Sequence, residues 1–224
     1  MSKSLLFRFA KPSDARHLAK LHIICGKNQT GSFMPLLGLR FLTAYYKILL
    51  SSEFSVVILA YCSEAKEFLG FHSGSIDASE MRDAFSKAKF QLGWTAITSF
   101  WFTPKILYEI IKRHRALHSN VSDFIIKNGP RGEYWAWKPG GLPSYGAGKL
   151  HKLWHHIMFA LGCEYVRSEV NVEHARVRKA VIAMGGKVIS ETTDLNNHAR
   201  IIVEYDLARY CRRFPLIEEK SINN

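Results

Sequence analysis

The sequence predicts a mixed α/β (α+β) fold, in which a central sheet is flanked by helices. β-branched runs typical of buried strands alternate along the chain with amphipathic helical stretches. A strand, a glycine-rich loop, a helix and another strand follow one another between residues 133 and 171. The 224 residues, 47% of them hydrophobic, are enough for one good core.

The first half of the chain predicts strands and helices in turn. LLFRFA, at residues 5–10, reads as a strand, and KPSDARHLAKLHIIC, at residues 11–25, as a helix with one buried side. Residues 36–50 predict a second helix. FSVVILAYC, at residues 54–62, and FLGFHSGSI, at residues 68–76, then predict two strands joined by a hairpin turn.

Residues 77–128 change in character and predict a helical insertion after the third strand. The segment contains a helical stretch at residues 80–91, the aromatic run FQLGWTAITSFWF at residues 90–102, and the proline-started helix PKILYEIIKRHRALH. We expect Trp94 and Trp101 to belong to the core of this insertion. A cover over an acceptor site and a surface for peripheral contact with a membrane are the alternatives.

The second half predicts the rest of the sheet. EYWAWKP, at residues 133–139, is a strand, and KLHKLWHHIMFALG is a helix closed by Gly162. Its apolar stripe consists of Leu150, Leu153, Trp154, Ile157 and Leu161. The strand EYVRSEVN, the helix VEHARVRKAVIAMGG and a final strand pair follow. Residues 211–224 predict a loose tail, and residues 1–224 a single domain.

The net charge limits the classes of binding partner that we expect. Lys and Arg number 31 against 19 Asp and Glu, which gives +12 at pH 7. Such a surface favours anionic partners: nucleic acid, phosphorylated cofactors or acidic membrane. A solvated basic surface without a partner explains the charge equally well. Because the basic residues are scattered and form no stripe, nucleic-acid binding is disfavoured.

Cysteine spacing and hydropathy limit the cellular compartments in which we expect the protein. The four cysteines lie far apart without C-x-x-C spacing, which argues against a zinc ribbon or a disulfide scaffold. Reduced thiols in the cytoplasm fit best. No uncharged apolar run reaches membrane-spanning length, so we expect no transmembrane segment.

The loop GGLPSYGAGK predicts an anion site. It lies between a strand and a helix, where backbone N–H groups at the helix N-terminus lack intrahelical partners and the helix dipole adds positive charge. Glycines allow close approach of the backbone to a phosphate, and Lys149 adds a full charge. Neither G-x-x-x-x-G-K-[ST] nor G-x-G-x-x-G is present. A plain strand-to-helix turn is the alternative.

This arrangement resembles the GNAT superfamily of acyl-CoA N-acyltransferases. The family's [Arg/Gln]-x-x-G-x-[Gly/Ala] signature corresponds to PSYGAG, at residues 143–148, with Pro143 in place of Arg or Gln. After its fifth strand the family often reads N-x-x-N-x-x-A-x-x-L-Y-x-x-x-G-F. In the corresponding segment, NVEHARVRKAVIAMGG, Asn171 matches the first Asn, His174 replaces the second, and Val181 stands at the tyrosine.

The resemblance covers roughly residues 5–207 and implies that acetyl-CoA, or another acyl-CoA, lies between splayed fourth and fifth strands. Strand backbone would pair with pantetheine, and the loop N–H groups would hold the pyrophosphate. The cofactor-binding residues that it implies are Trp135, Ala136, Trp137, Lys138, Pro143, Ser144, Tyr145, Gly146, Ala147, Gly148, Lys149, Asn171 and His174.

The resemblance also implies direct attack of an amine on a thioester, with a base for the amine proton and an acid for the departing thiolate. Val181 cannot supply the acid that the family takes from a tyrosine, so Tyr145, His174 or water takes that place. The candidate bases lie on strands expected to face the cleft: Glu133, Glu169 and His72. Each is otherwise a surface or satisfied polar residue.

Three histidines on the helix after the loop form a separate pattern. His151 and His155 share a helix face at i,i+4 and could bind a metal, and His156 is adjacent. Because no Glu completes an H-E-x-x-H arrangement, we expect solvated histidines and no metal.

The resulting hypothesis is an N-acetyltransferase that uses acetyl-CoA and a small primary amine such as an amino sugar. The alternative is a non-catalytic acyl-CoA-binding sensor or interaction protein, because Pro143 and Val181 depart from the family pattern. A nucleic-acid-binding module, motivated by the charge of +12, is the third class. The oligomeric state is left open.

Overall fold

The computed structural model describes residues 5–27, 34–100, 126–140, 145–193 and 198–216, and it contains a seven-stranded sheet. The strands are β1 (Leu5–Phe9), β2 (Ser55–Cys62), β3 (Glu67–Ser75), β4 (Arg131–Trp137), β5 (Tyr165–Asn171), β6 (Lys187–Thr193) and β7 (Ala199–Asp206). The α-helices are α1 (Ala15–Gly26), α2 (Gly38–Ser51), α3 (Ala78–Lys87), α4 (Lys89–Phe100), α6 (Tyr145–Ala160), α7 (Ala175–Ala183) and α8 (Leu207–Arg213). No helix in these ranges is long and apolar enough to cross a bilayer.

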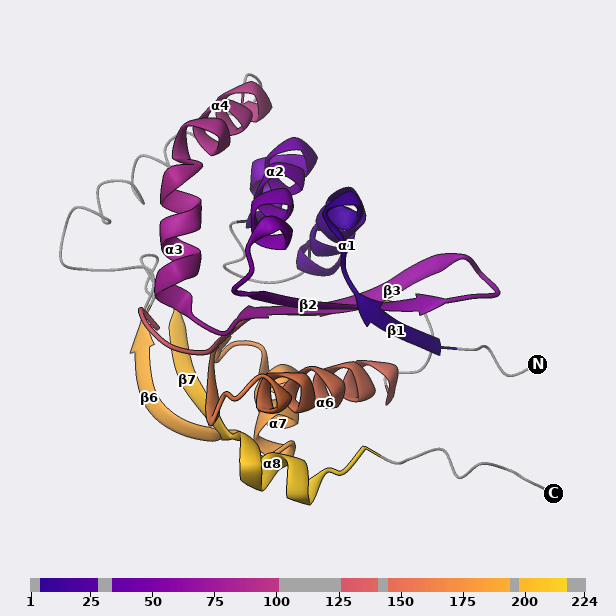
Figure 1. The fold of residues 1–224 in the computed structure, drawn as a ribbon, viewed down its shortest axis with the longest axis vertical. Helices are drawn as coiled ribbons and strands as arrows, with labels where there is room; N and C mark the ends of the chain where they lie inside the picture. Colours follow the sequence, from indigo (N-terminus) through magenta and orange to yellow (C-terminus); the bar gives the residue numbers. More distant parts are fainter. Residues whose placement is uncertain (1–4, 28–33, 101–125, 141–144, 194–197, 217–224) are drawn as a thin grey trace.

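The sheet is mixed, as the sequence predicts. Its order is β1-β2-β3-β4-β5-β7-β6. Every neighbouring pair is antiparallel except β4 and β5, which run parallel. Helices α1 to α4 lie on one side of the β1–β3 part of the sheet, and α6 and α8 lie on the other (Figure 1).

Both faces of the sheet are buried, which explains the continuous apolar run of β2. Val57 and Leu59 pack with α1 and α2, whereas Val56, Ile58 and Ala60 pack with α6. Since side chains alternate along a strand, a strand covered on both faces must be apolar at every position.

Helix α6 begins at Tyr145, so the GAGK residues form its first turn instead of preceding it. Gly162, at φ 86°, ends the helix as predicted. The predicted stripe is partly wrong, because Leu161 is exposed while Met158, His151 and His155 are buried. The helix is covered by the sheet on one side and by α8 on another. The two histidines lie between His72 and Tyr205 of the sheet and Tyr210 of α8.

Two helices, α3 and α4, follow the third strand as predicted. The carboxylate of Asp77 caps α3 by accepting hydrogen bonds from the backbone N–H groups of Ser79 and Glu80. The expected burial of the aromatic run is wrong for Phe90 and Trp94. Phe90 is 82% exposed and Trp94 is 70% exposed, since α4 contacts α2 through another face. Residues 101–125, with Trp101 and the proline-started helix, lie outside the described residues.

The segment predicted as a loose tail begins as a helix, and residues 217–224 lie outside the described residues. Cys211 and the two residues that follow it complete α8, which Asp206 caps by accepting a hydrogen bond from the N–H of Arg209. Phe214 then packs against Tyr210, with ring centroids 5.1 Å apart. Apolar side chains hold α8 in place, because Leu207 and Tyr210 are buried against α6 and β7.

Candidate functional site

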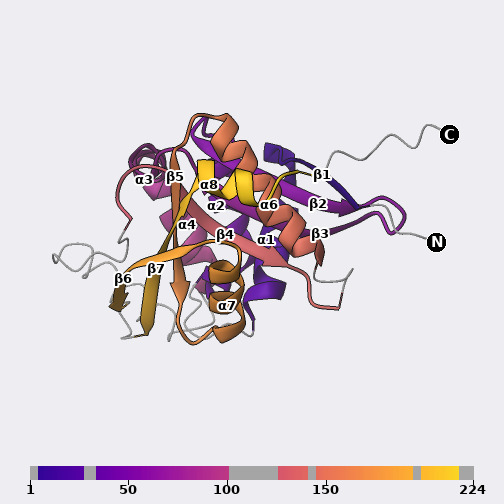
Figure 2. The same ribbon diagram turned by 90° about the horizontal axis from the view of Figure 1, so that it is seen from below.

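The parallel strands β4 and β5 separate soon after they meet. They pair only at Arg131 with Arg167 and at Gly132 with Ser168. A Cβ on Gly132 would lie 2.3 Å from the Ser168 hydroxyl oxygen, so glycine permits this close contact. Beyond it β5 diverges from β4, as Figure 2 shows, and no described strand pairs with this edge of β4.

A cavity of about 280 Å³ opens where the strands diverge. Its walls come from β3, β4, β5, β7, α6 and α7. Among the residues proposed from the sequence, the cavity brings together Glu133, Trp135, Glu169, Asn171, His174 and His72. Tyr145 is not among its lining residues.

A β-bulge aims Glu133 into this cavity. Gly132 pairs with Gly74 and Tyr134 pairs with Ser73, so Glu133 is an extra residue in β4. Its Oε2 accepts a hydrogen bond of 3.2 Å from the hydroxyl of Tyr45, on α2. The bulge therefore turns this carboxylate toward the α2 side of the sheet.

The charge of Glu133 acts on the pKa values of two neighbours, Tyr45 and Arg131. Burial raises the pKa of Tyr45 well above its usual value, and the charge of Glu133 adds to this effect, so Tyr45 stays a hydrogen-bond donor. Burial lowers the pKa of Arg131, but the charges of Glu133 and Glu169 outweigh it and leave this pKa raised. Arg131 is thus a permanent cation in the wall of the cavity.

Glu169 has a different environment. Its side chain is 8% exposed and lies between two guanidinium groups, with Oε1 3.4 Å from Arg131 Nη2 and Oε2 3.3 Å from Arg200 Nη1. Both carboxylate oxygens of Glu169 are therefore held in ion pairs with arginines.

The far wall of the cavity is formed by the end of β5 and by α7. Asn171 Oδ1 accepts a hydrogen bond of 2.9 Å from the N–H of Glu173, which orders the turn into α7. His174, the N-cap of α7, lines the cavity, and Val181 lines it one helix length further on. The hydroxyl of Tyr205, a residue that the sequence did not single out, donates to the carbonyl of Val181 at 3.3 Å.

The two glycines of the G-x-G have different surroundings. A Cβ on Gly146 would lie 2.5 Å from the Trp137 ring, so this glycine is needed for packing. A Cβ on Gly148 would meet nothing within 4 Å, which leaves room for a ligand at the first turn of α6. Tyr145 is 56% exposed there, with the ammonium of Lys149 over its ring. Pro143 and Ser144 lie outside the described residues.

Beside this turn, β4 ends at Trp137, and the next residue, Lys138, forms an ion pair with Glu67 through its ammonium. Because the N–H of Lys138 also donates to the carbonyl of Leu69, its backbone belongs to the β3–β4 ladder. The two residues before Lys138 belong to the sheet, where Ala136 is buried and Trp137 is half-buried.

Comparison with solved structures finds this architecture in acetyltransferases. The spermidine/spermine N-acetyltransferase SpeG from Vibrio cholerae, solved with manganese ions, superposes with a TM-score of 0.54 at 12% identity, over 93% of this chain and 96% of SpeG. FdhC, described as a nucleotide-linked sugar GNAT, gives 0.57 at 13% identity, over 94% and 91%. An N-acetyltransferase from Staphylococcus aureus Mu50 gives 0.54 at 8% identity, over 92% and 99%.

The chain has the GNAT fold. No protein-family model and no curated protein sequence matches it. The likeness therefore extends over nearly the whole chain while the sequences have diverged. The divergence of β4 and β5 lies where the resemblance predicts it.

The residues at the divergence fit an acyl-CoA. The edge of β4 beyond Gly132 faces no described strand, so it can accept an extended pantetheine arm as an added strand. The buried indole nitrogen of Trp135 has no hydrogen-bond partner among the described residues, and Trp135 lines the cavity. The space beside Gly148 leaves the helix N-terminus open to an anion.

The expectation of solvated histidines on α6 is wrong. His151 is 3% exposed and His155 is 1% exposed, and both contact His72 of β3, which is also 3% exposed. Ring contacts with Tyr205 and Tyr210 enclose His155. Sequence reasoning missed this because it treats histidine as polar. The i,i+4 spacing of His151 and His155 was the signal that could have found it.

Proposed function

We propose that this GNAT-fold chain is an acyl-CoA-dependent N-acyltransferase that transfers an acetyl group from acetyl-CoA to a primary amine of a small acceptor. One observation carries the proposal: β5 leaves β4 after Gly132 and opens a cavity into which the bulge turns a carboxylate. The direct aminolysis of a thioester requires three parts: a strand edge, a cavity and a carboxylate. The unpaired thiols of the four cysteines support a cytoplasmic setting.

Glu133 is the proposed base. Its carboxylate lines the cavity, and Tyr45 orients it by donating a hydrogen bond. An acyl-CoA would supply the thioester carbonyl that the acceptor amine attacks. Glu133 would accept the amine proton. His174 would donate a proton to the departing thiolate, because it lies at the N-cap of α7 in the cavity wall. Tyr145 is a weaker candidate for this acid, because it is exposed and outside the cavity.

The acceptor that we propose is an amino sugar, preferably one that carries phosphate. The net charge of +12 repels a polycation such as spermidine and attracts an anionic acceptor. Arg131 and Arg200 line the cavity as well, each in an ion pair with Glu169. FdhC, a nucleotide-linked sugar GNAT by its description, makes such acceptors the first to assay.

Titration with acetyl-CoA in a calorimeter tests the cofactor site. Gly148→Asp would place a negative charge where the pyrophosphate binds, and Gly148→Asn is the matched neutral control. We expect Asp to weaken binding by about tenfold or more relative to Asn, since one charge–phosphate repulsion is worth on the order of 1.4 kcal/mol in a partly screened site. Equal affinities of the two variants would refute the phosphate site. Gly146 is not suited to this test, because its Cβ would meet Trp137.

A turnover assay distinguishes an acyltransferase from a non-catalytic acyl-CoA-binding protein. Thiol release from acetyl-CoA is measured with amino sugars, nucleotide-linked amino sugars and spermidine. Release that depends on an amine supports the transferase. Tight binding of acetyl-CoA without release by any amine would favour a non-catalytic acyl-CoA-binding protein, a function to which Val181 points, because it lines the cavity where the family has a tyrosine.

A further inference from the structure

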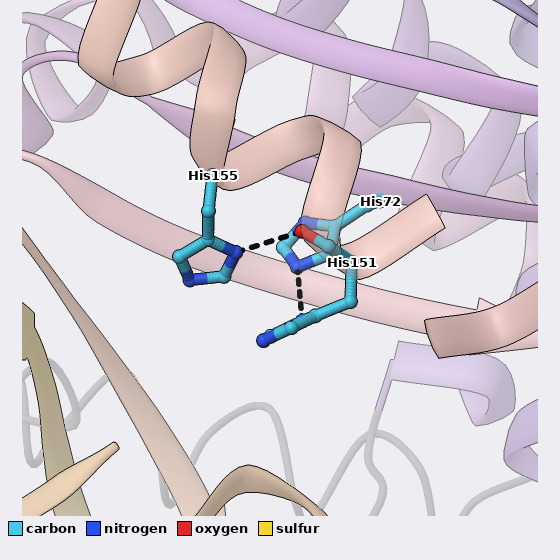
Figure 3. A group of neighbouring side chains, drawn as sticks. All are labelled: His72, His151 and His155. Carbon is cyan, nitrogen blue, oxygen red and sulfur yellow. Dashed lines mark hydrogen bonds between the residues drawn. The ribbon is translucent and has the colours of Figure 1, made fainter. Parts of the chain in front are cut away.

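Three buried histidines meet between the sheet and α6. The histidine cluster consists of His72 on β3 and His151 and His155 on α6, and each is at most 3% exposed (Figure 3). One ring nitrogen from each residue lies within 4.8 Å of the others. His72 and His151 also line the cavity between β4 and β5. This cluster plays no part in the proposed acyl transfer.

Hydrogen bonds satisfy only half of the six ring nitrogens. His72 Nε2 and His151 Nδ1 share a hydrogen bond of 3.2 Å, and His155 Nδ1 donates to the carbonyl of His151 at 2.8 Å. Figure 3 shows both bonds. Among the described residues, no partner is present for His72 Nδ1, His151 Nε2 or His155 Nε2. Buried polar atoms without partners are costly, so three of them in one place indicate a ligand.

The surroundings of the histidine cluster hold its rings in place. His155 donates Nδ1–H to a backbone carbonyl, which leaves a lone pair on Nε2. This second bond is the usual way in which proteins orient a metal-ligating histidine. The rings of Trp135, Trp154 and Tyr205 surround the cluster.

We propose that the histidine cluster binds a divalent transition-metal ion such as Zn²⁺, through one ring nitrogen of each histidine. Three neutral nitrogens suit Zn²⁺, Co²⁺ or Ni²⁺ and not Mg²⁺ or Ca²⁺. In a tetrahedral site with bonds of about 2.1 Å, ligand atoms lie about 3.4 Å apart, so small side-chain rotations close the present spacing.

Metal binding is measured on the whole chain after treatment with a chelator. Co²⁺ is the first probe, because a tetrahedral site gives it visible absorption bands, and Zn²⁺ is titrated against a chromophoric chelator. We expect one equivalent with a dissociation constant below about 1 µM. Absence of binding at this level would overturn the proposal. Acetyl-CoA is not present, so failure of the acyltransferase function would not affect this result.

Two variants locate the ion. His155→Gln removes one ligand, and we expect it to weaken Zn²⁺ binding about 100-fold or more. The matched control is His156→Gln, because the neighbouring ring bonds to the carbonyl of Phe214 and lies outside the cluster. Zn²⁺ should raise the melting temperature of the wild type and of His156→Gln but not of His155→Gln. Equal binding by both variants would place the ion elsewhere and refute the site.

One measurement needs no variant and remains available if His155→Gln does not fold. Crystals of the wild type grown with Zn²⁺ give anomalous scattering at the zinc edge. A peak between β3 and α6 at the cluster supports the proposal. Peaks confined to other histidines or to the cysteines contradict it, because the rings would then form only a hydrogen-bonded network.

Discussion

Acidification should destabilise the protein through His22, whose ring is held neutral inside the fold. His22 lies on α1 and is 4% exposed. Its Nδ1 is 2.6 Å from the hydroxyl oxygen of Tyr46, and its ring stacks on Tyr134 with centroids 3.8 Å apart. Burial lowers the pKa of this ring from 6.5 to about 3.

The sign and size of the effect follow from proton linkage. Between pH 6.5 and about 3 the unfolded chain binds a proton at His22 that the folded chain does not. The contribution of His22 to stability is therefore fully present above pH 6.5 and is lost as the pH falls toward 3. At pH 5 the difference amounts to roughly 1.5 pKa units, or about 2 kcal/mol. That is a large fraction of the stability of a typical domain.

Urea unfolding of the wild type and of His22→Phe at pH 8, 7, 6 and 5 measures this contribution. Phenylalanine keeps the ring stacked on Tyr134 but leaves the buried hydroxyl of Tyr46 without its partner. We expect the variant to be less stable than the wild type at pH 8 by about 1–3 kcal/mol. The gap should narrow by about 2 kcal/mol at pH 5, because only the wild type carries the titratable ring.

Tyr46→Phe is the control. It removes the same hydrogen bond but retains His22, and burial raises the pKa of Tyr46 so far that its hydroxyl does not titrate in this range. Its stability gap to the wild type should therefore stay nearly constant from pH 8 to pH 5. A gap for His22→Phe that also stays constant would refute the argument, since the folded ring would then bind its proton as readily as the unfolded one.

Three further predictions concern the site and the sheet around it. Glu133→Gln should lower kcat about 10²- to 10⁴-fold while calorimetry finds the affinity for acetyl-CoA unchanged; a normal kcat would exclude Glu133 as the base. Gly74→Ala should lower the free energy of unfolding by about 2 kcal/mol or more in urea, because its Cβ would lie 2.4 Å from both the carbonyl of Arg131 and the ring of Trp154. Trp154→Phe should cost about 1–3 kcal/mol in thermal unfolding, because the indole N–H donates to the carbonyl of Val56 at 2.9 Å; an unchanged melting temperature would contradict this.

The sequence predicts the fold well where apolar patterning decides the structure. The β-branched run of β2 and the glycine end of α6 lie where the pattern places them, and so does the pair formed by β6 and β7. Patterning fails where a second layer covers an element. His151 and His155 are buried between the sheet and α8, and no periodic pattern in the sequence predicts that second contact.

The candidate site could be predicted only in part, for a geometric reason. The glycine-rich loop and the strand before it are local signals, so the sequence alone can propose a position for a cofactor site, and that position stays a prediction. The choice among Glu133, Glu169 and His72 depends on partners distant in sequence. Glu169 lies between Arg131 and Arg200, and the sequence gives no sign of that pairing. Likewise the bulge is visible only in the register between β3 and β4.

That bulge links the two halves of the site. After the bulge, the side chains of Trp135 and Trp137 face α6. In the ladder, these two residues pair with His72 and Gly70 of β3. The extra residue shifts the alternation, so Gly132 faces Gly74 on that same side while Glu133 turns toward Tyr45 on the other. In a regular strand Glu133 would share the α6 face with the two tryptophans and meet apolar neighbours. In the proposed reaction, the bulge would thus let one strand offer its free edge to an acyl-CoA and a carboxylate to the acceptor on the opposite side.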